Sequence, residues 1–139
     1  MLSLVTLKAA ELREVQKMPH IDSSNSHAFA SVHYLSQAPR GGTAIYRYKP
    51  TNTIQIGQHN QDVVLQMIEQ VKATPNEHSG YINGDTSLFE IVVDIPERFN
   101  RLVLYKSNLL HSARLTHERS ISSSPKEGRL TVSSFFNDL

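Results

Sequence analysis

The stretch SLFEIVVDIPERFNRLVLYKSNLLHSARL, residues 87–115, decides which fold class we expect. It contains three short runs that are rich in β-branched and aromatic residues, at 87–96, 101–106 and 109–115, and such residues favour β-strands. Pro96 and the polar ERFN segment interrupt the first two runs. We therefore predict that these two strands form an antiparallel pair.

Three more strands are predicted on either side of this stretch. AFASVHYL (28–35) alternates its side chains between the two faces of an extended backbone, and TAIYRYK (43–49) and GRLTVSSFF (128–136) are again rich in strand formers. The two glycines at 41–42 permit a tight turn before the second of these strands. The serine-rich segment 116–127 is predicted to be a mobile loop between adjacent strands.

Helical periodicity is clearest in QDVVLQMIEQVKA (61–73), which stops before Pro75. Its predicted core-facing stripe comprises Val64, Leu65, Ile68, Val71 and Lys72. Residues 4–17 show a weaker amphipathic pattern that favours a helix and also allows an initial strand. Short strands with one or two helices favour an all-β sandwich, barrel or jelly-roll over alternating βαβ units.

Composition limits the classes of function. A chain of 139 residues suits one domain spanning 1–139, and a net charge of +1 gives no broad attraction to nucleic acid or to an anionic membrane. The sequence has no cysteine, which excludes disulfides and thiolate chemistry and fits the cytoplasm. We found no apolar stretch typical of a signal peptide or a membrane span.

The seven histidines are numerous for this length, and two of them have suggestive positions. His20 and Asp22 form an H-x-D pair, whose side chains leave the same face of an extended backbone. His111 is the best candidate for a third ligand, because two imidazoles and one carboxylate on one face suit iron(II) and leave positions open. In the alternative interpretation, Asp22 caps a turn beside Pro19 and Ser23.

The order of motifs along the chain resembles the 2-oxoglutarate- and iron(II)-dependent dioxygenase superfamily, and more closely an uncharacterised bacterial family within it. PHID, HYL, GGT, YKSNLLHS and GRLTVSSFF occur in that order, and the resemblance covers roughly residues 18–136. It implies a double-stranded β-helix, a form of jelly-roll. It also implies that His20, Asp22 and His111 are both metal ligands and catalytic residues.

The same resemblance implies residues for the co-substrate 2-oxoglutarate. The superfamily places a basic residue on its last core strand, often with a hydroxyl two residues later, and Arg129 and Thr131 match this R-x-[ST] pattern. A guanidinium can donate two parallel hydrogen bonds to a carboxylate. Arg114 is a rival for this role, and among the strand tyrosines we select Tyr46 as a further contact with 2-oxoglutarate.

Residues next to His111 are candidates for orienting it. Asn108 and Ser112 are two such candidates. The other five histidines lack a partner motif, so we expect them to lie at the surface or in packing contacts. They are His27, His33, His59, His78 and His117.

The implied activity is an oxygenase that couples oxidative decarboxylation of 2-oxoglutarate by O2 to hydroxylation of a small molecule, an amino acid or a peptide. Two alternatives stay open. One is a cupin-like metal-binding jelly-roll without 2-oxoglutarate. The other is a catalytically silent domain that binds a partner or forms a homo-oligomer, because only residues 1–19 precede the H-x-D pair and family members usually have more supporting elements there.

Overall fold

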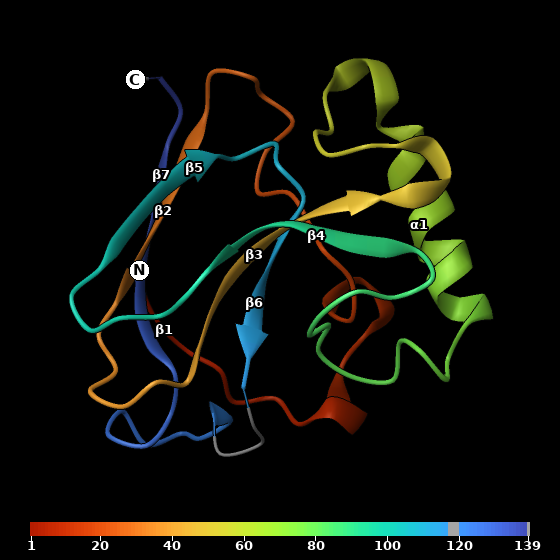
Figure 1. Ribbon diagram of the computed structural model, residues 1–139. Coiled ribbons are helices and arrows are strands. Elements are labelled where there is room, and N and C mark those ends of the chain that lie inside the picture. The colour runs from red at the N-terminus through yellow and green to blue at the C-terminus, as the bar shows by residue number, and fades with distance from the viewer. Residues whose placement is uncertain (117–119, 139) are drawn as a thin grey trace.

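The computed structural model describes residues 1–116 and 120–138 of the chain (Figure 1). Within these residues it contains short β-strands, one α-helix and several 3-10 turns. The strands and the helix are β1 (Leu2–Leu4), β2 (Phe29–Tyr34), β3 (Gly41–Tyr48), α1 (Asp62–Ala73), β4 (Phe89–Ile95), β5 (Leu102–Lys106), β6 (His111–Leu115) and β7 (Leu130–Phe136). The described part of the chain contains no helix that is both long and apolar enough to cross a membrane.

The strands form two antiparallel sheets, which confirms the expected all-β class with one helix. Sheet A has the order β1-β7-β2-β5 and sheet B the order β4-β3-β6. Figure 1 shows the two sheets next to each other, with α1 on the side of sheet B that is remote from sheet A. Sheet B is therefore covered on one face by the helix and turned toward sheet A on the other.

The predicted antiparallel pairing of two successive strands is wrong. The strands at 87–96 and 101–106 do not pair, because β4 pairs with β3 in sheet B and β5 pairs with β2 in sheet A. Between them the chain crosses from one sheet to the other through Asn100, which has a left-handed φ of 64°. Its backbone N–H donates to the carbonyl of Tyr34 at the end of β2. The crossing segment thus resembles a hairpin turn in sequence but joins two layers.

The same correction applies to the serine-rich loop. β6 lies in sheet B and β7 in sheet A, so the segment 116–127 also crosses between the sheets and does not join adjacent strands. His117 and the rest of 117–119 lie outside the described residues.

The helix at 61–73 is confirmed, and its predicted stripe is confirmed in part, because Val71 is buried and Val64 and Ile68 pack against the core, whereas Lys72 is exposed. Val63, Met67 and Val71, one helical turn apart, are buried against sheet B, whereas Leu65 is 67% exposed. Together with side chains from sheet B and its connections they form the main apolar core. This core contains Met18, Ala44, Tyr46, Tyr48, Ile56, Val63, Met67, Val71, Ile82, Leu88, Phe89 and Leu110.

Of the two predictions for residues 4–17, the helix is wrong and the initial strand is confirmed. Residues Leu2–Leu4 form β1, which pairs with β7 so that Leu2 lies opposite Val132, and two short 3-10 turns follow it. A weak helical periodicity in so short a segment stabilises an isolated helix poorly, whereas pairing with a strand satisfies the backbone at once.

β3 needs glycine at its first two positions. Gly41 has a φ of 127°, and a Cβ there would lie 2.0 Å from the carbonyl oxygen of Arg114. A Cβ on Gly42 would lie 1.9 Å from the carbonyl oxygen of Ile95. Any side chain would therefore displace backbone on either side of β3, which fixes where this strand begins.

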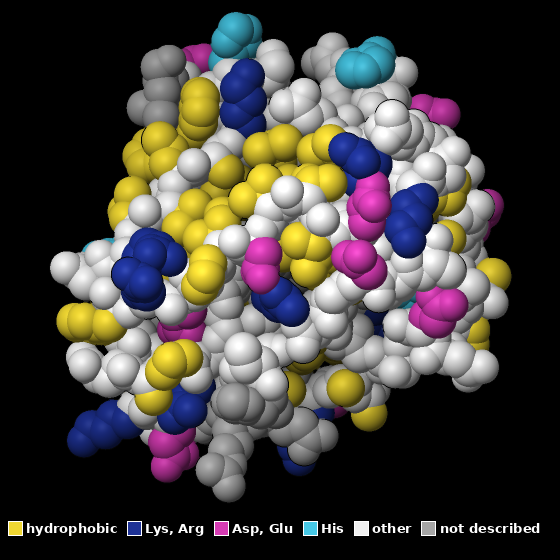
Figure 2. All heavy atoms as spheres, viewed as in Figure 1, with side chains coloured by type: hydrophobic (Ala, Val, Ile, Leu, Met, Phe, Trp, Pro, Cys, Tyr) yellow, Lys and Arg dark blue, Asp and Glu magenta, His cyan; other side chains and the backbone are white. Residues whose placement is uncertain are grey.

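The edge strand β5 carries an apolar outer face. Leu102 and Leu104 are 60% and 52% exposed, and apolar side chains gather over this part of the face seen in Figure 2. Lys106 continues the same outward row. A charge at the end of a short edge strand is a common protection against edge-to-edge association.

Candidate metal centre

The two histidines of the predicted triad are brought together by a single antiparallel bridge. His20 and His111 exchange both backbone hydrogen bonds, each with an N···O distance of 2.9 Å. The backbone N–H of Asp22 donates to the carbonyl of Ser107 at 2.8 Å, which holds the H-x-D segment extended beside the start of β6. Both side chains of the pair then point to the same side as His111.

The three side chains converge on one point. Their potential ligand atoms all lie within 4.8 Å of one another. Nε2 of His20 is 3.7 Å from Oδ1 of Asp22, and Nε2 of His111 is 3.3 Å from Oδ2. Ligands bonded to one ion at about 2.0–2.2 Å lie about 3 Å apart, so small side-chain adjustments suffice to close the site around a cation.

The tautomer of His111 directs its unprotonated ring nitrogen, Nε2, toward the carboxylate of Asp22. Nδ1 of His111 lies 2.8 Å from the carbonyl oxygen of Leu109, and only a protonated Nδ1 can donate to a carbonyl. In the neutral ring Nε2 is then an acceptor that faces an acceptor oxygen of Asp22. A cation between the two atoms removes this conflict, and a backbone carbonyl on the other ring nitrogen is the usual partner of a metal-ligating histidine.

Electrostatics keep the ligands in their metal-binding protonation states. Burial, together with the neighbouring His111, lowers the pKa of His20 to about 4 against the opposing effect of Asp22, so the His20 imidazole is neutral at pH 7. Partial burial acts to raise the pKa of Asp22. The close contact with the His111 side chain at 3.3 Å and the electrostatic influence of both histidines outweigh that effect and hold the pKa of Asp22 below its usual value.

The three side chains open into a cavity of about 270 Å³ between the two sheets. His111 is buried at its base with a side chain 6% exposed, and the carboxylate side chain of Asp22 is 17% exposed. The wall residues come from both sheets and from the segments before β2. They are Ser3, Val5, His20, Asp22, Val32, Thr43, Tyr105, His111, Ala113, Arg129, Thr131, Ser133 and Phe135.

Arg129 and Thr131 lie in the wall of this same cavity. Arg129 is 6% exposed, and its guanidinium donates from Nε to the carbonyl of Gly41 at 2.8 Å and from Nη2 to the carbonyl of Gly42 at 3.0 Å. These two bonds leave other N–H donors of the guanidinium for a ligand. Burial lowers the pKa of Arg129 from its ordinary high value, while nearby Tyr34 and Glu97 act in the opposite direction.

Comparison with known proteins adds a family but no chemistry. The family of unknown function DUF6445 matches residues 1–136. The chain belongs to this family. No curated protein matches this DUF6445 chain, and no solved structure matches it.

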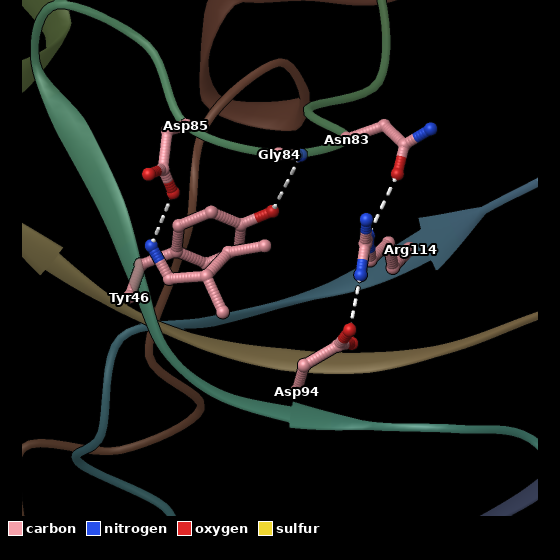
Figure 3. A network of polar contacts seen from close by, with 7 residues as sticks. Tyr46, Asn83, Gly84, Asp85, Asp94 and Arg114 are labelled. Atoms are coloured by element: carbon pink, nitrogen blue, oxygen red, sulfur yellow. Dashed lines mark hydrogen bonds and ion pairs between the residues drawn. The ribbon is translucent and has the colours of Figure 1, made fainter.

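Two other sequence candidates of the DUF6445 chain lie on the far face of sheet B (Figure 3). Tyr46 is fully buried in the core against α1, and the backbone N–H of Gly84 points at its hydroxyl at 3.5 Å. Arg114 donates to Asn83 at 2.9 Å and forms an ion pair with Asp94. Neither Tyr46 nor Arg114 lines the cavity, so the structure does not bring them to the triad.

Sequence reasoning missed Tyr105 and selected Tyr46 over Tyr34, although Tyr105 and Tyr34 are the tyrosines near the site. Tyr105 on β5 lines the cavity with its ring centroid 4.7 Å from that of His111, and burial raises the pKa of its phenol, so it stays protonated. Tyr34 stacks beneath the guanidinium of Arg129 at 5.5 Å and bonds Thr43 at 2.6 Å. The alternation of RLVLYK places Tyr105 on the inner face, a signal that was available in the sequence.

The expected supporting residues of His111 are also different. The hydroxyl of Ser112 donates to a neighbouring carbonyl of its own strand, and the side chain of Asn108 lines a separate depression. The carbonyl of Leu109 takes the orienting role. Among the remaining histidines, His78 is buried between two threonine hydroxyls, as expected of a packing residue.

Proposed function

We propose that this protein is an iron(II)- and 2-oxoglutarate-dependent oxygenase, and by default a hydroxylase, built on a double-stranded β-helix. One observation carries the proposal: a His/Asp/His triad and the Arg129–Thr131 pair line the same cavity between two sheets. His20 and Asp22 precede Arg129 by more than 100 residues in the sequence, and His111 lies on a different sheet from Arg129. A surface coincidence gives no reason for all of them to meet in one cavity.

Strand order supports the fold part of the proposal. The isolated bridge between His20 and His111 places the H-x-D segment beside β6, at the edge of the three-stranded sheet B and opposite the four strands of sheet A. Two facing antiparallel sheets with crossing connections suit a jelly-roll. The H-x-D pair then lies early and His111 late in the β-core, as the superfamily resemblance implies.

The donor set supports iron(II) as the metal. Two imidazoles and one carboxylate on one face form a facial triad, which leaves positions for a co-substrate and O2. The metal would be held by Nε2 of His20, a carboxylate oxygen of Asp22 and Nε2 of His111. When bound, iron(II) with 2-oxoglutarate supplies the oxygen activation and oxidative decarboxylation that no side chain of this protein can provide.

The cavity residues support 2-oxoglutarate as the co-substrate. The remaining donors of Arg129 and the hydroxyl of Thr131 face the cavity and can bind the distal carboxylate, while the protonated phenol of Tyr105 can donate a third hydrogen bond. Val32 and Ala113 give the wall apolar patches that exclude water. At about 270 Å³ the space suits a small dicarboxylate and is below the usual range of drug-sized ligand sites, about 300–1,000 Å³.

The test is an anaerobic titration. Iron(II) and then 2-oxoglutarate are added to the purified protein, and the proposal expects a metal-to-ligand absorption band that saturates with 2-oxoglutarate. The variant His111→Ala is expected to lose the band. Metal binding without any band on adding 2-oxoglutarate would instead support a cupin-like protein, and no metal binding at all would end the proposal.

A further inference from the structure

A second depression lies next to the metal centre and is lined almost only by neutral polar side chains. It measures about 520 Å³, and its wall includes Ser23, Gln55, Gln58 and Asn108. The described lining residues include no Lys, Arg, Asp or Glu. His59 is the one titratable side chain among the described lining residues, so a ligand that carries a net charge meets no fixed counter-charge here.

Among the described residues, Asn108 is the buried residue of this depression whose side chain has an unpartnered polar atom. The residue is 5% exposed, and its amide oxygen is buried without a hydrogen-bond partner in the described part of the chain. A buried polar atom without a partner usually costs about 1–3 kcal/mol, and such atoms are rare in native proteins. An amide group presents one acceptor and two donors, so another amide, which offers both a C=O and an N–H, complements it in full.

An apolar depression continues from the polar one. Ile21, Ile56, Val64 and the exposed Leu65 of α1 line it, and its volume is about 390 Å³. Its wall shares Ser23 and Ser24 with the polar depression and Asp22 with the metal cavity.

The hydrogen bond from Gln61 at the start of α1 to Ser24, at 3.2 Å, holds the helix against the shared serine segment. The three spaces are therefore neighbours along Asp22–Ser24. A ligand that fills the two depressions reaches the metal ligands.

We infer that the polar and apolar depressions together form the substrate subsite of the proposed oxygenase, and that the substrate is an uncharged peptide segment with an apolar side chain. The peptide's main-chain amides lie against Asn108 and the glutamine amides. Its apolar side chain lies on Ile56, Val64 and Leu65. This inference rests on the proposed function, because Asp22, which lines both the apolar depression and the metal cavity, links the subsite to the reacting centre.

The experiment uses the full chain loaded with Mn(II) and 2-oxoglutarate, so that no turnover occurs and the paramagnetic ion reports proximity. Mn(II) binding is measured first without peptide, and its failure counts against the proposed function alone. The probe is acetyl-Ala-Leu-Ala-amide, compared with capped tripeptides that carry Asp or Lys in place of Leu and with maltotriose. The readout is relaxation of the probe's protons in solution NMR.

We expect the paramagnetic relaxation of the leucine peptide's protons to show saturable binding. The charged peptides and maltotriose are expected to bind at least about tenfold more weakly. Asn108→Leu is expected to weaken binding of the leucine peptide by at least about tenfold and to leave Mn(II) binding unchanged. Its Tm is expected to be unchanged or higher, since the substitution removes an unpaired buried amide. Asn83→Leu, on the other face of sheet B, is the matched control and leaves peptide binding unchanged.

Three outcomes overturn the inference while leaving the metal centre intact. They are Mn(II) binding without relaxation of any peptide, equal binding of charged and neutral probes, and an Asn108→Leu variant that binds the peptide as tightly as the parent chain. Tighter binding of maltotriose than of the leucine peptide would assign the depression to a polyol and also overturn it.

Discussion

The replacement of Arg129 by lysine separates the binding of 2-oxoglutarate from the binding of metal. The planar guanidinium of Arg129 binds the carbonyls of Gly41 and Gly42 and still has N–H groups that face the cavity. Lysine keeps the positive charge but lacks this planar group. Loss of one charge-assisted hydrogen bond to the distal carboxylate costs about 1.5–3 kcal/mol, which corresponds to a rise in Kd of about 10- to 160-fold.

The same substitution affects stability, because lysine can satisfy at most one of the two buried carbonyls well. We expect a loss of about 1–3 kcal/mol in the free energy of unfolding. For a chain of this length that is a drop in Tm of roughly 3–5 °C per kcal/mol. Arg129→Met removes the charge as well and is expected to lower both quantities further.

The assay for Arg129→Lys is the anaerobic titration with 2-oxoglutarate on the iron(II)-loaded protein, with Tm measured on the same sample. Arg114→Lys is the matched control, since Arg114 is bound to Asn83 and Asp94 on the other face of sheet B and is expected to leave the Kd unchanged. A folded, iron-binding Arg129→Lys protein whose Kd for 2-oxoglutarate stays within twofold of the parent would refute the assignment.

Three further predictions concern the triad and the glycine turn. Mn(II) at about 100 times its Kd should stabilise the protein by about 2.7 kcal/mol and raise Tm, and His111→Ala should abolish that rise in a thermal scan. The pKa of His20 is about 4 in the folded protein and 6.5 in the unfolded chain, so the metal-free protein should lose stability as pH falls from 6.5 toward 4. His20→Gln should flatten this part of the plot of Tm against pH. An unchanged plot would count against the environment described for His20. Gly42→Ala should destabilise the fold by more than about 4 kcal/mol in urea unfolding, and a loss below about 1 kcal/mol would contradict the close approach of Ile95 to β3.

Local patterns predicted most of the individual elements. The strands near residues 29–34 and 41–48 and the helix at 62–73 follow from alternation, β-branched content and helical spacing. The H-x-D pair and His111 converge because two residues of an extended segment point the same way. These features depend on neighbours in sequence, which is the information that a single sequence provides directly.

Partner choice between strands was not predictable in the same way. Nothing local distinguishes a hairpin between β4 and β5 from a crossing between sheets, because Pro96 and a polar segment suit both. Tyr46 lies away from the cavity for a related reason: it shares with Ala44 the face of β3 that α1 covers, opposite the face on which Thr43 lines the cavity. Which face of a strand meets a cavity is decided by the layers on each side of it.

The pairing of β1 and β2 with β7 has a consequence for the order in which the molecule assembles. The metal ligands and the strands of sheet B are complete once residue 115 has been synthesised, whereas Arg129 and Thr131 arrive with the last strand. Long-range pairing of this kind is slow, since the chain must lose the entropy of closing a long loop before the contacts stabilise it. During synthesis the nascent chain therefore contains the His20, Asp22 and His111 triad before it contains the Arg129–Thr131 pair of the proposed dicarboxylate site.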